Sequence, residues 1–356
     1  MNEENVYMGK IKIGLIVLAI LAILFVFSAC DGQTAPEKTP TETIVQSEQS
    51  ADDKETIPGE TLADTSAESE QSTDGKETIE DKTIDTMEKM VGIDGVISVT
   101  SQTFTRDISG AVAYKVLYES ENGKLAADVV LPADYFKVNK LYAVLIYFPE
   151  VGIDIDSLAY YFAQKGVIVI RHYARGYDQS EGVRDLGGEK DLVDVQKLLE
   201  IFDSADFIKN RKVFVAGSSE GSINALRLFA EDTKKRISGC AVVDVIADLP
   251  AFGEFRGERI QQLNATLIGK SYEEAPEEYD LRSAVKFSEK LDRPILLLHF
   301  LQNPIFSVEQ TDAFYDLIIQ TNPDCTYHKI EAQGADFVCT ESLRLLVYWM
   351  AGELIK

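Results

Sequence analysis

One short stretch of the sequence combines residues that can carry out nucleophilic chemistry. In VFVAGSSEGSINAL, four strand-forming residues lead into Gly-Ser-Ser-Glu-Gly and then into a helix-like run. Glycines at 217 and 221 permit a sharp strand-to-helix turn, which predicts that the Ser219 hydroxyl projects above a sheet. The start of the following helix favours a developing oxyanion, and we expect the Glu220 N–H to be one donor to it. The alternative is an ordinary tight turn followed by a helix cap.

A serine alcohol is a poor nucleophile near neutral pH, so Ser219 would need a general base that is itself held by an acid. The chain has three histidines, and each lies in or at the end of an expected strand: His172, His299 and His328. Histidines in such places are usually structural, and His172 is the best placed of the three because it follows a strand whose end faces the site. The histidines and cysteines match no metal-binding pattern, and we expect neither a metal nor another cofactor.

From residue 91 onward, strand-type and helix-type segments alternate. Apolar runs predict strands at residues 113–120, 124–132, 141–148, 166–173, 212–217, 237–245, 294–300 and 326–332. Helix-length segments lie at residues 156–165, 189–205, 222–234, 308–320 and 340–355. This alternation indicates an α/β fold with a mostly parallel eight-stranded sheet and helices on both faces. Glu121-Asn122-Gly123 predicts a hairpin between the first two strands.

The segment 189–205 has the spacing of an amphipathic helix. Its apolar residues recur at helical intervals at Leu192, Val195, Leu198, Leu199 and Phe202. We expect Asp191, Asp194 and Lys197 to lie on the opposite, polar face.

The first 90 residues have a different character. Lys10 and Lys12 precede an apolar run at 13–27, which is too short for a membrane span and fits an export signal. Between Asp31 and Lys89 there are seventeen acidic residues against five lysines, and no aromatic residue. This composition predicts that residues 31–90 form a disordered spacer. The formal net charge of −24 argues against a nucleic-acid partner.

The end of the export signal, Phe27-Ser28-Ala29-Cys30, resembles the lipobox of bacterial lipoproteins. Phe27 departs from the leucine that is usual in that family. The resemblance implies that residues 1–30 are a signal peptide and that Cys30 is lipidated, which would anchor the chain in the cell membrane, facing outside the cytoplasm. An uncleaved signal anchor is the alternative, and it puts the domain on the same side.

Three further cysteines lie in the domain. Cys240 is in an apolar run and is expected to be a buried small side chain. Export would permit a Cys325–Cys339 disulfide, and the sequence leaves open whether it forms.

Four segments resemble, in the right order, the α/β-hydrolase fold, and more narrowly its prolyl oligopeptidase and dienelactone hydrolase branch. They are KLAADVVLPADY, RHYARGYDQSEG, VAGSSEGS and PEEYDLRSAVKFSEKLDRPILLLHF. The resemblance covers the chain from about residue 113 to the C-terminus and implies a serine esterase or peptidase that acts on a small ester or peptide. Within the domain, 91–356, residues 249–280 are expected to form a short helical cap whose inward-facing residues are Phe252, Phe255, Leu263 and Leu267.

Three catalytic positions depart from the family pattern. The acid position after the seventh strand carries Asn303, and the histidine position in the loop after the eighth strand carries Asp336. The loop that supplies the second oxyanion donor reads YFPEVG, in which Pro149 has no N–H and Glu150 adds negative charge. Two hypotheses follow. The chain is a tethered serine hydrolase with a non-standard base, such as Asp336 or His172, or it is an inactive pseudo-hydrolase that serves as a binding or scaffold lipoprotein.

Overall fold

The computed structural model describes residues 90–102, 111–121, 123–132, 143–150, 156–204, 211–334, 336–337 and 339–355. The expected signal peptide, the lipidation candidate Cys30 and residues 31–89 of the expected spacer lie outside the described residues. Met90, the last residue of that spacer, is fully buried in the core. Within the part of the chain that the structure describes, no helix has the length and apolar character needed to cross a membrane.

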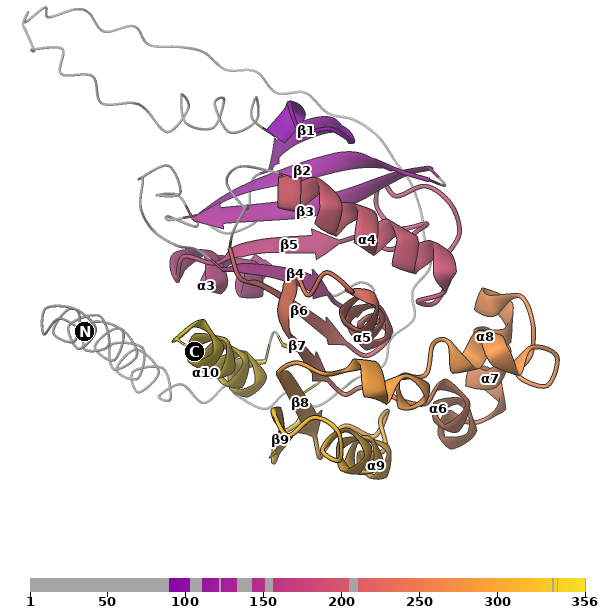
Figure 1. Cartoon of the computed structure of the whole chain (residues 1–356). Coiled ribbons are helices and arrows are strands. Elements are labelled where there is room, and N and C mark those ends of the chain that lie inside the picture. Colours follow the sequence, from indigo (N-terminus) through magenta and orange to yellow (C-terminus); the bar gives the residue numbers. More distant parts are fainter. Residues whose placement is uncertain are drawn as a thin grey trace, which may run out of the picture. The chain divides into compact units, whose positions relative to one another are not determined.

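Nine strands form a single sheet in the order β1-β2-β3-β5-β4-β6-β7-β8-β9 (Figure 1). Their bounds are β1 Val96–Gln102, β2 Ala111–Ser120, β3 Gly123–Pro132, β4 Val144–Phe148, β5 Ile168–His172, β6 Val213–Ser218, β7 Ile237–Val243, β8 Ile295–Phe300 and β9 Cys325–Ile330. The eight expected strands are all present, and β1 is the addition. As an edge strand with one buried residue, Val99, β1 needs few apolar side chains and gave a weak sequence signal.

The sheet is parallel from β5 to β9 and antiparallel at its other end. Strands β5, β4, β6, β7, β8 and β9 pair in parallel, whereas β1, β2 and β3 pair antiparallel and β3 joins β5 antiparallel. The expected hairpin is confirmed, because Ser120 at the end of β2 pairs with Gly123 at the start of β3. Parallel strands end on one common edge, so loops after β4, β5, β6, β7 and β8 meet there.

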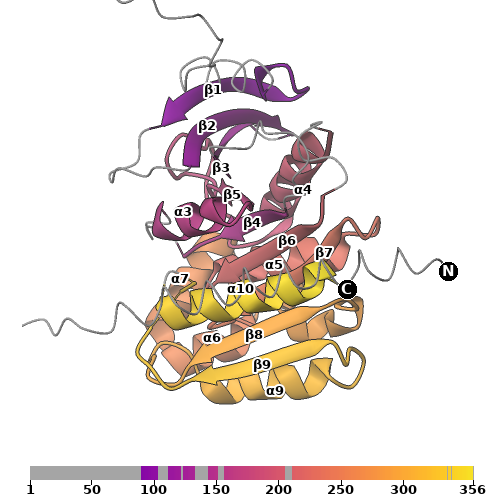
Figure 2. The ribbon, with the colours of Figure 1, turned by 90° about the vertical axis from the view of Figure 1, so that its left-hand side faces the viewer.

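Helices cover both faces of the sheet, as expected. Figure 2 shows α3 and α10 on the near face, and the helices α4, α5 and α9 pack on the opposite core. The helix bounds are α3 Asp156–Gln164, α4 Glu189–Ser204, α5 Gly221–Glu231, α6 Leu249–Arg256, α7 Glu258–Ile268, α8 Pro276–Asp280, α9 Val308–Ile318 and α10 Thr340–Ile355, with 3-10 turns at Ala284–Lys286 and Ser288–Lys290. Side chains alternate between the two faces of each buried strand, and this alternation explains the near-continuous apolar runs in the sequence.

The polar face expected for α4 is wrong at two of its three residues. Asp191 and Asp194 are buried, with exposed fractions of 3% and 0%. Asp194 accepts a hydrogen bond from the Ser120 hydroxyl and forms an ion pair with Arg175, whose Nη2 lies 2.6 Å from Asp194 Oδ1. The segment after β5 carries Arg175 over this face of the helix, so a stripe that a lone helix would expose to water is enclosed by the fold.

Residues 249–280 contain the three helices α6, α7 and α8, and the prediction that four of their apolar residues face inward is wrong for two of them. Phe252 is buried and stacks on Phe306 with ring centroids 5.4 Å apart. Leu267 packs partly buried against the same cluster. By contrast, Phe255 is 50% exposed and Leu263 is 43% exposed. Few residues of the first two helices are buried, namely Leu249, Phe252 and Gly253 in α6 and Asn264 in α7, which leaves Phe255 and Leu263 at the surface.

The three described cysteines are free thiols. Cys240 is fully buried, as expected from its apolar run. The Cys325–Cys339 disulfide that the sequence left open is not formed in this structure.

Candidate active site

The turn after β6 places Ser219 at a strained backbone position. Ser219 has φ = 52°, in the left-handed region that side chains other than glycine seldom adopt. Its N–H donates to the Val243 carbonyl at 3.3 Å, which ties the turn to the end of β7. A Cβ atom at Gly221 would overlap the Phe148 carbonyl, and one at Gly217 would overlap the Gly221 backbone. The Gly-x-Ser-x-Gly spacing is therefore required by close backbone approach as well as by the turn.

The Ser219 hydroxyl makes no hydrogen bond to any described residue, although Ser219 itself is only 6% exposed. All three histidines lie within the described residues. His172 is buried and its Nε2 has no partner there. His299 Nδ1 lies 3.0 Å from Thr311 Oγ1, and His328 is exposed on the edge strand β9. No imidazole therefore hydrogen-bonds to Ser219.

Burial also makes His172 and His299 poor proton acceptors. Burial, together with the charge of Arg175, lowers the pKa of His172 to about 3. Burial also lowers the pKa of His299. For His299, burial outweighs the charges of Asp312 and Glu309, which favour its protonated form, so both side chains are neutral near pH 7.

Asp336 faces the serine that precedes the nucleophile position. Its carboxylate Oδ2 accepts a hydrogen bond of 2.7 Å from the Ser218 hydroxyl, and Oδ1 accepts one from the Tyr147 hydroxyl. Asp336 is 1% exposed, and the Phe337 N–H also donates to Oδ1. The carboxylate thus ties the end of β6 to the end of β4.

The Glu150 N–H, which the sequence predicts as the place of a second oxyanion donor, also hydrogen-bonds to Ser218. It donates to the Ser218 hydroxyl oxygen at 3.0 Å. Burial, and then the nearby charge of Glu220, raise the pKa of the Glu150 side chain. Glu220 itself pairs with Arg184 and makes no side-chain cap to α5. The turn after β6 is therefore flanked by two carboxylates, of which Glu220 is ion-paired.

Asn303, which the sequence predicts at the acid position, hydrogen-bonds to the Asp244 carboxylate and to the backbone. Its Nδ2 donates to Asp244 Oδ2 at 2.7 Å, and its Oδ1 accepts the Ile305 N–H at 3.1 Å. Asp244 was missed in the sequence, although it directly follows β7 on the same sheet edge as Ser219. It is fully buried, has φ = 48°, and burial raises its pKa to about 6. Its position in VVDV, at the end of an apolar run, was the signal that could have found it.

Comparisons with known proteins point to one architecture. No protein-family model matches the chain. A 150-residue segment is 24% identical to the uncharacterised peptidase YtmA of Bacillus subtilis, covering 42% of this chain and 57% of that protein. This chain therefore matches little more than half the length of that relative.

Solved structures match over a larger part of the chain. The esterase Pf2001 of Pyrococcus furiosus superposes with a TM-score of 0.53 at 15% identity, covering 72% of this chain and 96% of the esterase. Acetyl xylan esterase 1 of Thermoanaerobacterium gives 0.55 at 16% identity, covering 77% and 93%. A putative dipeptidyl aminopeptidase IV of Bacteroides ovatus gives 0.55 at 15% identity, covering 73% of this chain and 36% of the peptidase. The domain has the α/β-hydrolase fold.

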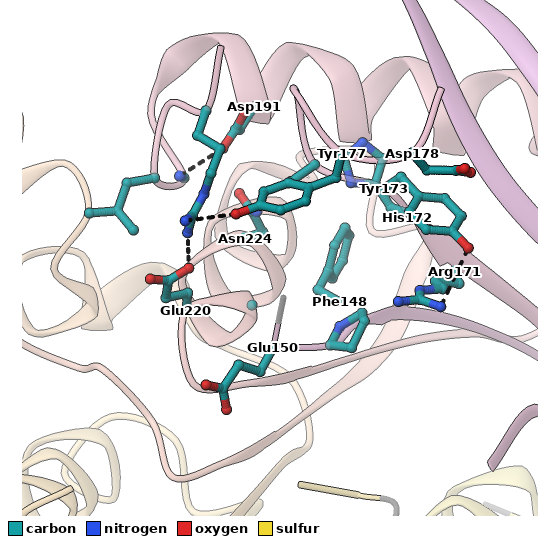
Figure 3. Close-up of a pocket in the computed structure, with 16 residues that line it drawn as sticks. Phe148, Glu150, Arg171, His172, Tyr173, Tyr177, Asp178, Asp191, Glu220 and Asn224 are labelled. Carbon is teal, nitrogen blue, oxygen red and sulfur yellow. Dashed lines mark hydrogen bonds and ion pairs between the residues drawn. The ribbon is translucent and has the colours of Figure 1, made fainter. Parts of the chain in front are cut away.

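A pocket of about 180 Å³ opens beside the turn of this α/β-hydrolase domain (Figure 3). We call it the β5 pocket, because residues 171–178 at and after the end of β5 form much of its wall. The remaining wall comes from the end of β4 and the residues after it, and from the segments around α4 and the start of α5: Phe148, Pro149, Glu150, Arg184, Leu186, Gly187, Asp191, Glu220, Gly221 and Asn224. Ser219 is not among the lining residues, but Glu220 and Gly221 are. The pocket is therefore a place for a ligand next to the nucleophile position.

Proposed function

We propose that this α/β-hydrolase domain binds a small ester- or peptide-type ligand and that its hydrolysis at Ser219 is weak or lost. One observation carries the proposal: the Ser219 hydroxyl has no basic partner among the described residues. The side chains at the other two triad positions are engaged elsewhere, Asp336 by Ser218 and Asn303 by Asp244. The esterase and peptidase neighbours support the class of ligand.

The expected loss of rate is large. Without a base, the Ser219 proton has no acceptor when the oxygen attacks, and loss of a triad member typically costs about four to six powers of ten in kcat. The Glu150 carboxylate beside the turn adds a further penalty, because Glu220 is paired with Arg184 whereas Glu150 has no ion pair among the described residues. Ligand binding needs neither a base nor an oxyanion hole, so the β5 pocket can bind a ligand even where hydrolysis is lost.

A slow serine hydrolase is the second candidate, and the turn itself favours it. Ser219 keeps a strained backbone conformation that costs about 1–3 kcal/mol, and strain of this kind usually accompanies a functional position. Under this candidate Asp244 or Asp336 would have to reach the hydroxyl after a local rearrangement.

We also propose that the domain is tethered to the cell membrane and faces outside the cytoplasm. The resemblance of residues 27–30 to a lipobox supports lipidation at Cys30, and the acidic composition of residues 31–89 supports a tether between the lipid and the domain.

A serine-directed probe separates the two candidates. The full-length chain and its Ser219→Ala variant are treated with a fluorophosphonate and assayed with short p-nitrophenyl esters, with Ser222→Ala as a matched serine control. We expect neither labelling nor ester hydrolysis above the Ser219→Ala background. Labelling that depends on Ser219, with turnover of the ester, would establish the slow hydrolase instead.

A further inference from the structure

A second pocket, of about 230 Å³, lies in the region of α6–α8, where α6 packs against α7 and contacts α8 (Figure 1). We call it the cap pocket. Its wall comes from α6, α7, α8 and the segment 271–273 that follows α7. It shares no lining residue with the β5 pocket, so it is a separate place for a ligand.

Asn264 brings a nearly buried amide to the wall of the cap pocket. The residue is 5% exposed, and its side chain makes no hydrogen bond to any described residue. Its Nδ2 lies over Gly253 of α6, which also lines the pocket, at 3.6 Å from the place that a Cβ atom of residue 253 would take. The amide atoms are not fully enclosed, so a ligand in the pocket can reach them. An amide that is largely removed from water and unpaired is costly, and a ligand that hydrogen-bonds to it removes this cost.

The charge at the wall of the cap pocket is entirely negative. Three carboxylates line it, one from each of three elements: Glu254 of α6, Glu258 of α7 and Glu273 of the following segment. None of the described lining residues is a lysine, an arginine or a histidine, and none of these carboxylates has an ion-pair partner in the described part of the chain. A wall with one sign of charge attracts a ligand of the opposite sign.

The carboxylates do not converge on one point. Among the described residues, no group of three or more acidic, histidine or cysteine side chains is arranged to hold a metal ion. An organic cation fits this arrangement better, because the field of all three carboxylates attracts it while it contacts only one of them.

Two tyrosines supply the aromatic part of the wall. Tyr272 is 39% exposed and Tyr279 is 4% exposed, and their rings meet edge to face with centroids 5.4 Å apart. A guanidinium group stacks on aromatic rings, holds its donors in one plane and is more weakly hydrated than an ammonium group. It can also donate to an amide oxygen and to a carboxylate from one position. A guanidinium group therefore suits this wall better than an ammonium group does.

We propose that the cap pocket binds a guanidinium group. The Asn264 amide oxygen is the hydrogen-bond acceptor, and the three carboxylates of the wall supply the attracting charge. The ligand is a small compound or peptide that carries an arginine-type side chain. This site goes beyond the function proposed for the domain and does not depend on it.

Matched ligands test the chemistry of the site. N-acetyl-L-arginine amide and N-acetyl-L-citrulline amide have nearly the same shape, but only the first carries a guanidinium charge. N-acetyl-L-lysine amide carries the same charge on an ammonium group. Binding of each compound to the full-length chain is measured by calorimetry at pH 7.0 and low salt. We expect the arginine compound to bind at least about tenfold more tightly than the citrulline compound, and more tightly than the lysine compound.

Variants test the place of binding. Asn264→Ala should weaken the arginine compound at least about fivefold, and it removes no hydrogen bond within the described protein. The double variant Glu254→Gln, Glu258→Gln should weaken it at least about tenfold, because two of the three attracting charges are lost. Glu277→Gln, at an exposed carboxylate of α8 that does not line the pocket, is the matched control and should change binding less than about twofold. Circular dichroism confirms that each variant is folded.

Each remaining outcome would overturn the site. Equal binding of the arginine and citrulline compounds, or no binding of either, would show that no guanidinium is recognised. Undiminished binding in both the Asn264 variant and the double variant would place the ligand elsewhere. Equally tight binding of the lysine compound would show that charge alone is recognised. None of these results touches the proposed function, which depends on probe labelling and ester hydrolysis at Ser219.

Discussion

Asp336 accepts a 2.7 Å hydrogen bond from Ser218, the residue immediately before the nucleophile position, and makes no hydrogen bond to Ser219. The same serine oxygen accepts the Glu150 N–H. One buried carboxylate and one buried hydroxyl therefore join the ends of β4 and β6 to the loop after β9.

Asp336→Ala should destabilise the protein. It would leave the Ser218 and Tyr147 hydroxyls without their buried acceptor, and we expect the free energy of unfolding to fall by about 2–4 kcal/mol. Chemical denaturation followed by circular dichroism measures this. Glu331→Ala, an exposed acidic residue of the same loop, is the control and should stay within about 0.5 kcal/mol of the wild type. A loss as small as that of the control would show that the network contributes little.

Asp244→Asn should weaken the pH dependence of stability. Burial raises the pKa of Asp244 from 3.8 to about 6, so the folded state binds a proton more tightly than the unfolded state. Its contribution to stability is complete below pH 3.8 and is lost as the pH rises through about 6, which amounts to roughly 3 kcal/mol. Asp191 behaves in the same way and remains in the variant.

The measurement for Asp244 is the free energy of unfolding between pH 4 and pH 7.5. The wild type should lose more stability over this range than Asp244→Asn does, whereas the exposed variant Glu189→Gln should follow the wild type. Parallel curves for wild type and Asp244→Asn would contradict the raised pKa.

Ser219→Gly should stabilise the protein by about 1 kcal/mol, because glycine adopts φ = 52° without the strain that a Cβ atom brings. Ser219→Ala keeps the Cβ atom and removes the hydroxyl, so it should show no such gain. Thermal unfolding of the two variants side by side gives the comparison. If alanine stabilises as much as glycine, the hydroxyl rather than the backbone is the source of strain.

Arg175→Met should cost about 3–5 kcal/mol, since it leaves the Asp194 carboxylate buried without its cation. The double variant Arg175→Met, Asp194→Leu should recover a large part of that loss, because it removes the unpaired charge as well. Denaturant unfolding of the wild type, both single variants and the double variant completes the cycle. Additive losses would mean that the two side chains are not coupled.

The lipidation that we propose at Cys30 predicts that Cys30→Ser abolishes lipid attachment and releases the chain from membranes. Incorporation of labelled palmitate in a bacterial host, followed by separation of membrane and soluble fractions, measures both. Membrane association of the wild-type chain without labelling would support the uncleaved signal anchor.

The sequence by itself determined the alternation of strands and helices and the turn that carries Ser219. These features depend on local preferences: apolar runs of strand length, helical spacing of apolar residues, and glycines where backbone must approach backbone. The hairpin at residues 120–123 and the burial of Cys240 were predicted on the same basis. The edge strand β1 was not, because an exposed strand needs little apolar signal.

Only the tertiary structure decided which polar groups meet. Asp191 and Asp194 have the spacing of a solvated helix face, yet the segment after β5 encloses them and supplies Arg175. The direction of the Asp336 carboxylate, toward Ser218, depends on how the loop after β9 crosses the ends of β4 and β6. Contacts between residues more than a hundred positions apart follow from packing, and local sequence patterns carry no record of them.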